Sequence, residues 1–267
     1  MKFIRYAIKN SFLSKMVYRT YTVVTIVSAV FGLLIQIAIW TALYNGRGLM
    51  QAGNDTVVSI SEMIQYTVLS ALLSILINNN VISNIEQRIV SGQVSIDFIR
   101  PIGFSIQVIC SEIANVLFNV LFTFLPMILI SFFLVGVKAF AIANPTIFVL
   151  TLFNSIILFY SINYMIGLLS FWFLTIGPLR QILDGMIKLL SGALIPLWFL
   201  PKTIYNVASF LPFRLIYFFP ISVGVGKTSW QEIFEGIMLQ YFWIAFFVGL
   251  CAVLWNRGNK RLTVQGG

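Results

Sequence analysis

Residues 83–104 read SNIEQRIVSGQVSIDFIRPIGF and lie between two long apolar runs. The stretch carries four charged side chains, those of Glu86, Arg88, Asp97 and Arg100. Charged side chains are costly in hydrocarbon, so this part of the chain is expected to leave the bilayer. The neighbouring runs are then candidates for membrane spans, and the charged stretch connects them.

The pattern inside this stretch predicts two short helical pieces. Ile85 and Ile89 fall on one face of a helix. Gly92 suits the end of that helix, because glycine adopts the left-handed conformation without strain. A second piece, 94–99, ends before Pro101, which disfavours helix at the preceding residue. We interpret the stretch as a small amphipathic helix and turn on the membrane surface, available to another protein; an ordinary solvated loop is the alternative.

The composition of the whole chain excludes a soluble core. The 267 residues are 59% hydrophobic and 9% charged, with a mean hydropathy of +0.95. Soluble domains carry about 25% charged residues. At roughly 20 to 25 residues per span, the chain has room for about six transmembrane helices. We therefore predict an all-α polytopic membrane protein that forms a single domain over residues 1–267.

The apolar runs set the positions of the predicted elements. The six spans are placed at 21–44, 62–81, 106–135, 145–175, 180–200 and 233–255, with a tail at 256–267. Residues 1–19 carry basic but no acidic side chains, and their apolar residues recur at helical spacing. This predicts an amphipathic interface helix. A cleaved signal peptide is disfavoured, because the charge-free run 20–46 is too long for its apolar core.

The segment 201–230 is too interrupted to span a membrane and too apolar for a free loop. It contains Pro201, Pro212 and Pro220, with Arg214 between aromatic patches. Irregular backbone at membrane depth is tolerated where protein covers it. We predict a pair of short helices that re-enter the outer leaflet, with an interfacial loop held by its aromatic residues as the alternative.

Three charges open the fifth predicted span. Arg180, Asp184 and Lys188 are spaced four residues apart, so they share one helix face and can pair along it. They form either a locally satisfied ladder on a cytoplasmic extension of the helix or the lining of an inner vestibule. The sequence leaves both interpretations open.

The distribution of Lys and Arg predicts the topology. Basic residues gather at the N-terminus, in 83–104, at Arg180 and in the tail. By the positive-inside rule, both termini and 83–104 are predicted to be cytoplasmic. The net charge of +9 is attributed to loops that face anionic lipid, and no nucleic-acid partner is expected. Cys110 and Cys251 lie in apolar contexts and are predicted to be reduced and structural.

The residues needed for catalysis are not evident. The chain has no histidine and no complete G-x-x-x-x-G-K-S/T phosphate-binding loop, because Gly226-Lys227-Thr228 lacks the first glycine, and its eight carboxylates are scattered. We therefore expect no catalytic site and no metal site, and the chain is not predicted to be an enzyme. An ion-coupled carrier would need buried ionisable groups at mid-membrane and inverted repeats, and neither is apparent. A membrane pore subunit driven through a cytoplasmic contact surface remains, with 83–104 as the best candidate for that surface.

Several motifs, in order, resemble one known family. They are the acidic-basic helix, glycine and Ile99-Arg100-Pro101 end of 83–104, then Phe171-Trp172, the run 191–197, the residues 217–220 and the closing Gln265-Gly266-Gly267. With these motifs the chain resembles the ABC-2 type permeases, the six-helix membrane subunits of bacterial ABC exporters. The resemblance covers nearly the whole chain.

The resemblance implies a function and partners. Residues 83–104 are similar to the coupling helix that docks into an ATP-binding-cassette ATPase. The coupling residues would be Glu86, Arg88, Gly92, Asp97, Arg100 and Pro101. ATP and Mg would bind to a partner ATPase dimer and no cofactor to this chain, and a second permease, identical or related, would complete the pathway. The resemblance also implies export across the bacterial cell membrane.

The expected cargo is amphipathic or hydrophobic, such as a drug, a peptide or a lipid-like molecule. The pathway is expected to be lined by aliphatic and aromatic side chains, which suits such a cargo. Two other functions remain open at this point: an ion-coupled secondary carrier, and a membrane protein that gives immunity to a toxin.

Overall fold

The computed structural model describes residues 2–16, 19–51, 56–78, 80–99, 103–136, 140–173 and 175–265. The helices in the first half are α1 (Lys2–Met16), α2 (Arg19–Tyr44), α3 (Ile60–Leu76), α4 (Val81–Val90), α5 (Gln93–Ile99), α6 (Phe104–Asn119) and α7 (Leu125–Val135). Those in the second half are α8 (Pro145–Leu168), α9 (Gly177–Leu190), α10 (Lys202–Phe210), α11 (Phe218–Val225) and α12 (Trp230–Gln265). Shorter turns are η1 (Val120–Phe124, π-helical), η3 (Leu169–Phe171), η4 (Leu197–Phe199) and η5 (Pro212–Leu215).

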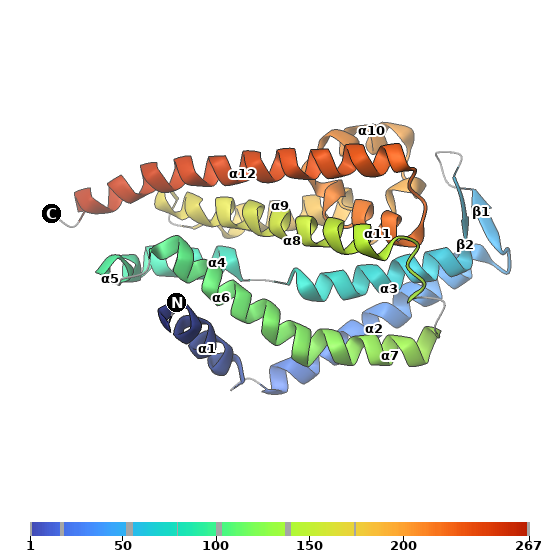
Figure 1. Ribbon diagram of the computed structural model, residues 1–267, viewed down its shortest axis with the longest axis horizontal. Helices are drawn as coiled ribbons and strands as arrows, with labels where there is room; N and C mark the ends of the chain where they lie inside the picture. The colour runs from blue at the N-terminus through green and yellow to red at the C-terminus, as the bar shows by residue number, and fades with distance from the viewer. Residues whose placement is uncertain are drawn as a thin grey trace.

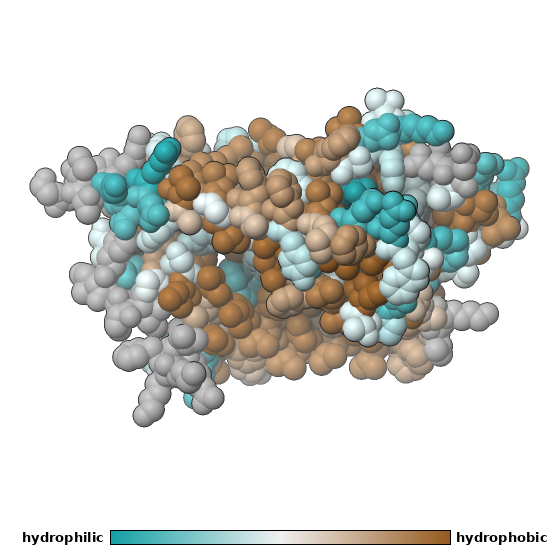
Figure 2. Space-filling model, turned by 45° about the horizontal axis from the view of Figure 1, so that its top comes forward, coloured by the Kyte–Doolittle hydropathy of each residue, from teal (hydrophilic) through white to brown (hydrophobic). Residues whose placement is uncertain are grey.

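Five helical segments are long and apolar enough to cross a membrane. They are Thr20–Tyr44, Ile60–Val90, Phe104–Val135, Pro145–Phe171 and Trp230–Lys260. Most of them run along the long axis of the molecule (Figure 1). Hydrophobic residues cover the middle of the face in Figure 2, and hydrophilic residues gather toward the two ends. The prediction of an all-α polytopic membrane protein is confirmed at this level.

The fifth predicted span, 180–200, is shorter in the structure than predicted. Helix α9 has 14 residues and ends at Leu190. At 1.5 Å per residue it is about 21 Å long, less than the roughly 30 Å of a hydrocarbon core. A sixth crossing of the membrane therefore stays a prediction.

The chain leaves helical geometry after α9, and side chains of α3 satisfy the freed backbone. The Tyr66 hydroxyl donates to the carbonyl oxygen of Gly192 at 2.8 Å, and Ser70 Oγ donates to that of Ala193 at 2.8 Å. Gly192 has φ +80°, and a Cβ there would lie 2.9 Å from both Tyr66 Oη and Phe218 Cβ. Irregular backbone is stable next to hydrocarbon when protein satisfies it in this way.

The segment 201–230 forms two short helices, α10 and α11, joined by the 3-10 turn η5. Its prolines lie at helix starts, where a missing N–H costs little: Pro201 is the N-cap of α10, Pro212 opens η5, and Pro220 is in the first turn of α11. The Arg214 side chain is partly buried. Re-entry of this segment into the membrane stays a prediction.

A small antiparallel hairpin connects α2 to α3. Strand β1 (Leu49–Gln51) pairs with β2 (Val57–Ser59), with Leu49 opposite Ser59. The Tyr44 hydroxyl donates to the Val58 carbonyl oxygen at 3.0 Å and anchors the hairpin to the end of α2. Ser59 then caps α3 in a reciprocal arrangement with Glu62.

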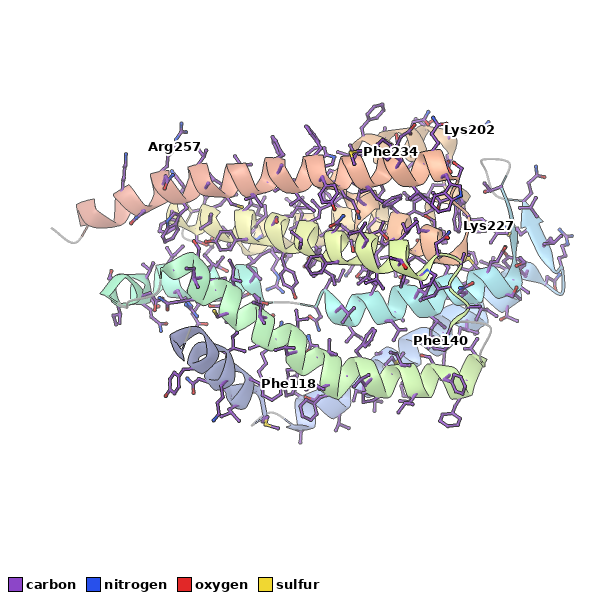
Figure 3. All side chains as sticks on the ribbon, viewed as in Figure 1. Phe118, Phe140, Lys202, Lys227, Phe234 and Arg257 are labelled. Atoms are coloured by element: carbon purple, nitrogen blue, oxygen red, sulfur yellow. The ribbon has the colours of Figure 1, made fainter. Side chains whose placement is uncertain are left out.

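The core lies around α8, which packs against α4, α11 and α12. The largest buried cluster includes Tyr66, Leu73, Leu158, Ile162 and Tyr217. Helices α1, α4 and α5 and the end of α12 lie at one end of the molecule, and the hairpin with α10 lies at the other (Figure 1). Lys202 and Lys227 are at the end that carries the β1–β2 hairpin, and Arg257 is near the opposite end (Figure 3). Which end faces the cytoplasm stays a prediction.

Candidate functional site

The stretch 83–104 contains two helices and a tight turn at one end of the molecule. Helix α4 begins at Val81, and its C-cap is Ser91. Gly92 follows with φ +73°, the left-handed conformation that the sequence predicts for it. Helix α5 starts at the next residue. We call α4, the turn and α5 the α4–α5 hairpin.

A buried charge pair holds the two helices of the hairpin together. Arg88 Nη1 lies 3.4 Å from Asp97 Oδ2, and the Asp97 side chain is 0% exposed against 19% for Arg88. Gln107 of α6 donates to the Asp97 carbonyl oxygen at 3.2 Å, and the Arg88 guanidinium lies 6.0 Å from the Phe104 ring centre. The sequence led us to expect Asp97 to face a partner, but its carboxylate lies inside the protein.

The structure describes only some of the remaining predicted coupling residues. Arg100 and Pro101 lie outside the described residues. Glu86 is on α4 and accepts a hydrogen bond at Oε1 from the Ile176 N–H, at 3.0 Å. Ile176 is the N-cap of α9, so the carboxylate satisfies a backbone donor beside that helix start. A role of these residues in coupling stays a prediction.

Helix α9 is also tied to α4 by its first charged residue. Arg180 donates to Ser83 Oγ, and its Nε lies 3.8 Å from Asp184 Oδ2. The side chains of this ion pair are 38% and 49% exposed. Lys188 is exposed on the same helix. The structure thus pairs the first two of the three predicted charges, and a vestibule lined by them stays a prediction.

Helix α4 packs closely on α8 at a glycine. Ile85 of α4 is 0% exposed, and a Cβ added to Gly167 of α8 would lie 2.7 Å from Ile85 Cδ1. Only glycine fits this contact without a shift of its neighbours. The α4–α5 hairpin is therefore in firm contact with α8 as well as with α6 and α9.

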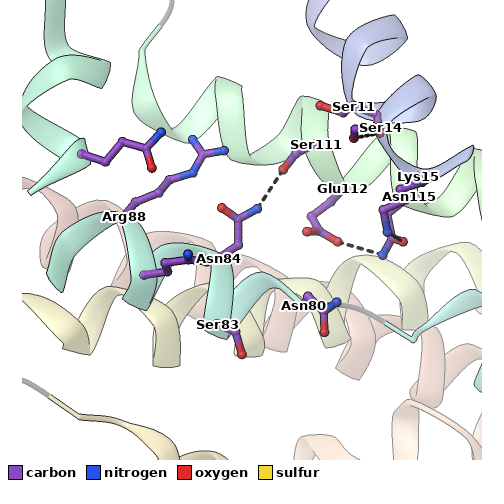
Figure 4. Close-up of a pocket in the computed structure, with 12 residues that line it drawn as sticks. Ser11, Ser14, Lys15, Asn80, Ser83, Asn84, Arg88, Ser111, Glu112 and Asn115 are labelled. Atoms are coloured by element: carbon purple, nitrogen blue, oxygen red, sulfur yellow. Dashed lines mark hydrogen bonds between the residues drawn. The ribbon is translucent and has the colours of Figure 1, made fainter. Parts of the chain in front are cut away.

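A cavity of about 630 Å³ lies between α1, α4 and α6. Twelve residues line it, and every one is polar or charged (Figure 4). Helices α1 and α6 contribute Ser11, Ser14, Lys15, Ser111, Glu112 and Asn115. In a chain with 9% charged residues, such a lining marks a candidate binding site.

Asn115 lies between two opposite charges in this cavity. The Lys15 ammonium donates to Asn115 Oδ1, and Asn115 Nδ2 donates to Glu112 Oε2 at 3.3 Å. Partial burial lowers the pKa of Lys15 from its usual value, and the negative charge of Glu112 opposes this shift. Lys15 and Asn115 also line a second cavity of about 340 Å³.

Sequence reasoning missed these cavities, although a signal was present. Ser111, Asn115, Asn119 and Thr123 recur every four residues in the third predicted span, so they form a polar stripe on one face. The structure uses this stripe: Asn115 and Asn119 donate to the Asn78 carbonyl oxygen, between α3 and α4, at 3.2 and 3.3 Å. Polar residues inside a span are rare and point to function.

The His, Cys, Asp and Glu side chains are the remaining candidates for metal binding or thiol chemistry. Among the side chains that the structure describes, no group of three or more His, Cys, Asp or Glu could hold a metal ion. Cys110 and Cys251 are free and buried.

The fold and this end of the molecule define a polytopic helical membrane protein with a helical hairpin and a polar cavity at one end. The sequence pattern of a family described as ABC-2 family transporter protein matches residues 56–266, well over half of the chain. The chain belongs to this family and is a membrane component of a transport system, and the resemblance noted in its sequence is confirmed. Membership of this family implies in general a partnership with an ABC ATPase. A comparison with curated proteins found no match.

Proposed function

We propose that this protein is the membrane-spanning subunit of an ATP-driven exporter. It would form the pathway for an amphipathic or hydrophobic cargo together with a second permease, in a bacterial cell membrane with both termini cytoplasmic. ATP and Mg would bind to a separate ATPase dimer. Family membership supports this proposal, and the α4–α5 hairpin is the structural observation that carries it.

The hairpin has the construction that a docking element needs. Its inside is fastened by the Arg88–Asp97 pair. Its outside exposes two large apolar side chains, Val90 at 54% and Ile96 at 58%. Exposed apolar residues on a rigid, otherwise polar element favour a protein contact over solvent. We therefore assign Val90 and Ile96 to the docking face, and Arg88 and Asp97 to holding its shape.

The hairpin's contacts suggest how ATPase movement would reach the membrane. Closure of the ATPase dimer on ATP would displace the docked hairpin. Ile85 would transfer the displacement to α8, and Glu86 would transfer it to the start of α9 through the Ile176 N–H. ATP would thus favour one access state through its different affinity for the two states of the ATPase.

Gentle purification of the tagged chain from native membranes tests this proposal. We expect an ATPase to co-purify, and the variant Ile96→Asp to lose it by roughly tenfold or more, as is typical of a central contact residue. Leu49→Asp is the matched control, because Leu49 is 62% exposed in β1 at the opposite end. A chain that purifies without an ATPase, or equal losses in both variants, would contradict docking through the hairpin.

Transport in sealed vesicles separates export from the other functions. Export is expected to require ATP on the side of the membrane that the α4–α5 hairpin faces. Transport should stop when the ATPase cannot hydrolyse ATP. Uptake driven by a proton gradient without ATP would instead identify an ion-coupled carrier. Protection against a toxin with no movement of any cargo would identify an immunity protein.

A further inference from the structure

We propose that the cavity between α1, α4 and α6 binds the headgroup of an aminophospholipid, which carries a phosphodiester and a primary ammonium group. The proposal concerns a lipid site on this chain and does not depend on the proposed export function. It rests on the charges of Lys15, Arg88 and Glu112, on Asn115, which lies between Lys15 and Glu112, and on the surface next to the cavity.

The cations of the lining suit a phosphate group. Lys15 extends from α1 and Arg88 from α4, at opposite ends of the lining with Glu112 between them (Figure 4). The phosphate is assigned to Lys15, which Asn115 links to Glu112. The Lys15 ammonium is partly buried, and within the part of the chain that the structure describes it forms no salt bridge. The Arg88 guanidinium has five N–H donors, and the contact with Asp97 involves one of its nitrogens. A phosphate oxygen would supply the acceptor that a half-buried cation requires.

Glu112, which lies between the two cations, suits an ammonium group (Figure 4). Glu112 is buried, with 9% of its surface exposed, and like Lys15 it forms no salt bridge among the described residues. Its Oε2 accepts from Asn115, which leaves acceptor capacity on the carboxylate. Asn115 bonds to Lys15 and to Glu112, so the two ions lie on opposite sides of one amide. A headgroup with both charges can bridge them.

The total charge favours a headgroup that is neutral overall. Lys15 and Arg88 contribute two positive charges, and Glu112 together with Asp97 contributes two negative ones. A zwitterion preserves this balance, whereas an anion would add an uncompensated charge to a partly buried site. The cavity volume of about 630 Å³ is within the range of small-ligand sites.

The surface beside the cavity favours a lipid over a soluble phosphoamine. On α6, Ile109 is 53% exposed and precedes Glu112 by three residues, so the two side chains are neighbours on the helix surface. An acyl chain can lie against Ile109 while the headgroup occupies the polar cavity. Helix α1 forms one wall, and its basic, amphipathic sequence suits the headgroup layer of a membrane.

The test compares lipids that differ in N-methylation on the intact, full-length chain. Wild-type protein in phosphatidylcholine nanodiscs is titrated with phosphatidylethanolamine, and retained lipid is counted by native mass spectrometry. We expect phosphatidylethanolamine to be retained about tenfold better than phosphatidylcholine, because a trimethylammonium group cannot donate to Glu112. Retention should fall stepwise through the monomethyl and dimethyl lipids. Equal retention across the series would overturn the proposal without any variant.

Charge-removing variants locate the site. Lys15→Gln is expected to reduce phosphatidylethanolamine retention roughly tenfold. Lys9→Gln is the matched control, because Lys9 is an exposed residue of the same helix outside the cavity lining. Glu112→Gln keeps the side-chain shape and should abolish the preference between the two lipids. Equal losses in Lys15→Gln and Lys9→Gln would show general attraction to the membrane and would contradict a defined site.

Two further outcomes would assign the cavity to another occupant. Displacement of the retained lipid by equimolar free phosphoethanolamine would identify a soluble ligand and reject the lipid. If Lys15→Gln instead prevents co-purification of an ATPase while lipid retention stays unchanged, the cavity is a protein contact. Loss of lipid retention with the ATPase still bound supports the lipid site and leaves the docking assignment intact.

Discussion

At the end formed by α10, η5 and α11, the polar groups of an irregular backbone are satisfied internally. Tyr66 and Ser70 bind the carbonyls of Gly192 and Ala193, and the Trp198 and Phe218 rings pack edge to face 5.1 Å apart. At the opposite end, α1, α4 and α6 leave a polar cavity of about 630 Å³. The two ends differ in packing: side chains bury the backbone carbonyls of Gly192 and Ala193 at the first, whereas polar side chains surround an open cavity at the second.

This difference separates a part that holds shape from a part that receives other molecules. Backbone carbonyls that are bound by buried side chains hold one arrangement, because movement would leave those groups unpaired. Polar groups around an open cavity gain from water, a ligand or a partner instead. We therefore expect substitutions at the closed end to act on stability, and substitutions at the open end to act on binding.

The largest expected effect is at the closed end, in the variant Gly192→Val. A β-branched residue at φ +80° is strained, and its Cβ would lie 2.9 Å from Phe218 Cβ. We expect a loss of at least about 3 kcal/mol in the free energy of unfolding, measured as a fall in the thermal midpoint in detergent. Gly249→Val in α12 is the control, since a Cβ there meets nothing within 4 Å. Equal losses in the two variants would show that the backbone at Gly192, where the chain leaves helical geometry after α9, is not tightly held.

An intermediate effect is expected at the open end, in Asp97→Asn. The change leaves Arg88 without its buried partner, but Arg88 is 19% exposed, so we expect a local cost of about 1 to 3 kcal/mol. Hydrogen exchange of the α5 amides should accelerate, while the global midpoint changes little. Asp184→Asn removes an ion pair that is 38% and 49% exposed and serves as the control. Unchanged exchange in α5 would contradict the role of Asp97 in holding the hairpin.

The smallest effect is expected for Lys227→Gln. Lys227 Nζ lies 2.9 Å from Glu62 Oε1, and the two side chains are 26% and 29% exposed. We expect a cost of about 0.5 to 1 kcal/mol at low salt that disappears at high salt, because ions screen a pair at the surface. Thermal midpoints of both proteins at the two salt concentrations provide the measurement. A deficit that persists at high salt would show that Lys227 acts through a contact that salt does not screen, such as its hydrogen bond to the Val57 carbonyl oxygen, and would contradict the ion-pair explanation.

The sequence was sufficient where structure follows from local pattern. The apolar runs predicted a polytopic helical protein, and the structure has five helical segments that are long and apolar enough to cross a membrane, because hydrophobic length is set by the membrane itself. The α4–α5 hairpin followed from Ile85, Gly92 and the charges of Glu86 and Arg88, all within one short segment. Gly92 adopts the left-handed conformation expected for it.

The features that sequence reasoning missed depend on contacts between distant residues. Tyr66 binds the backbone that follows α9 at Gly192, 126 positions away, and Lys15 meets Asn115 of the cavity, 100 positions away. Local periodicity does not report such pairs. The burial of Asp97 was missed for the same reason, since Gln107 and Arg88 reach it only when α5 folds back.

The glycine contact between α4 and α8 has a mechanical consequence. Close-packed protein hardly compresses, so a displacement of Ile85 cannot be absorbed at Gly167, where even one methyl group would overlap. Any movement of α4 would therefore be transmitted almost completely to α8, and the two helices would move as one rigid unit. A larger side chain at Gly167 would push α4 and α8 apart and loosen their contact. Part of any movement of the α4–α5 hairpin would then not be passed on to α8.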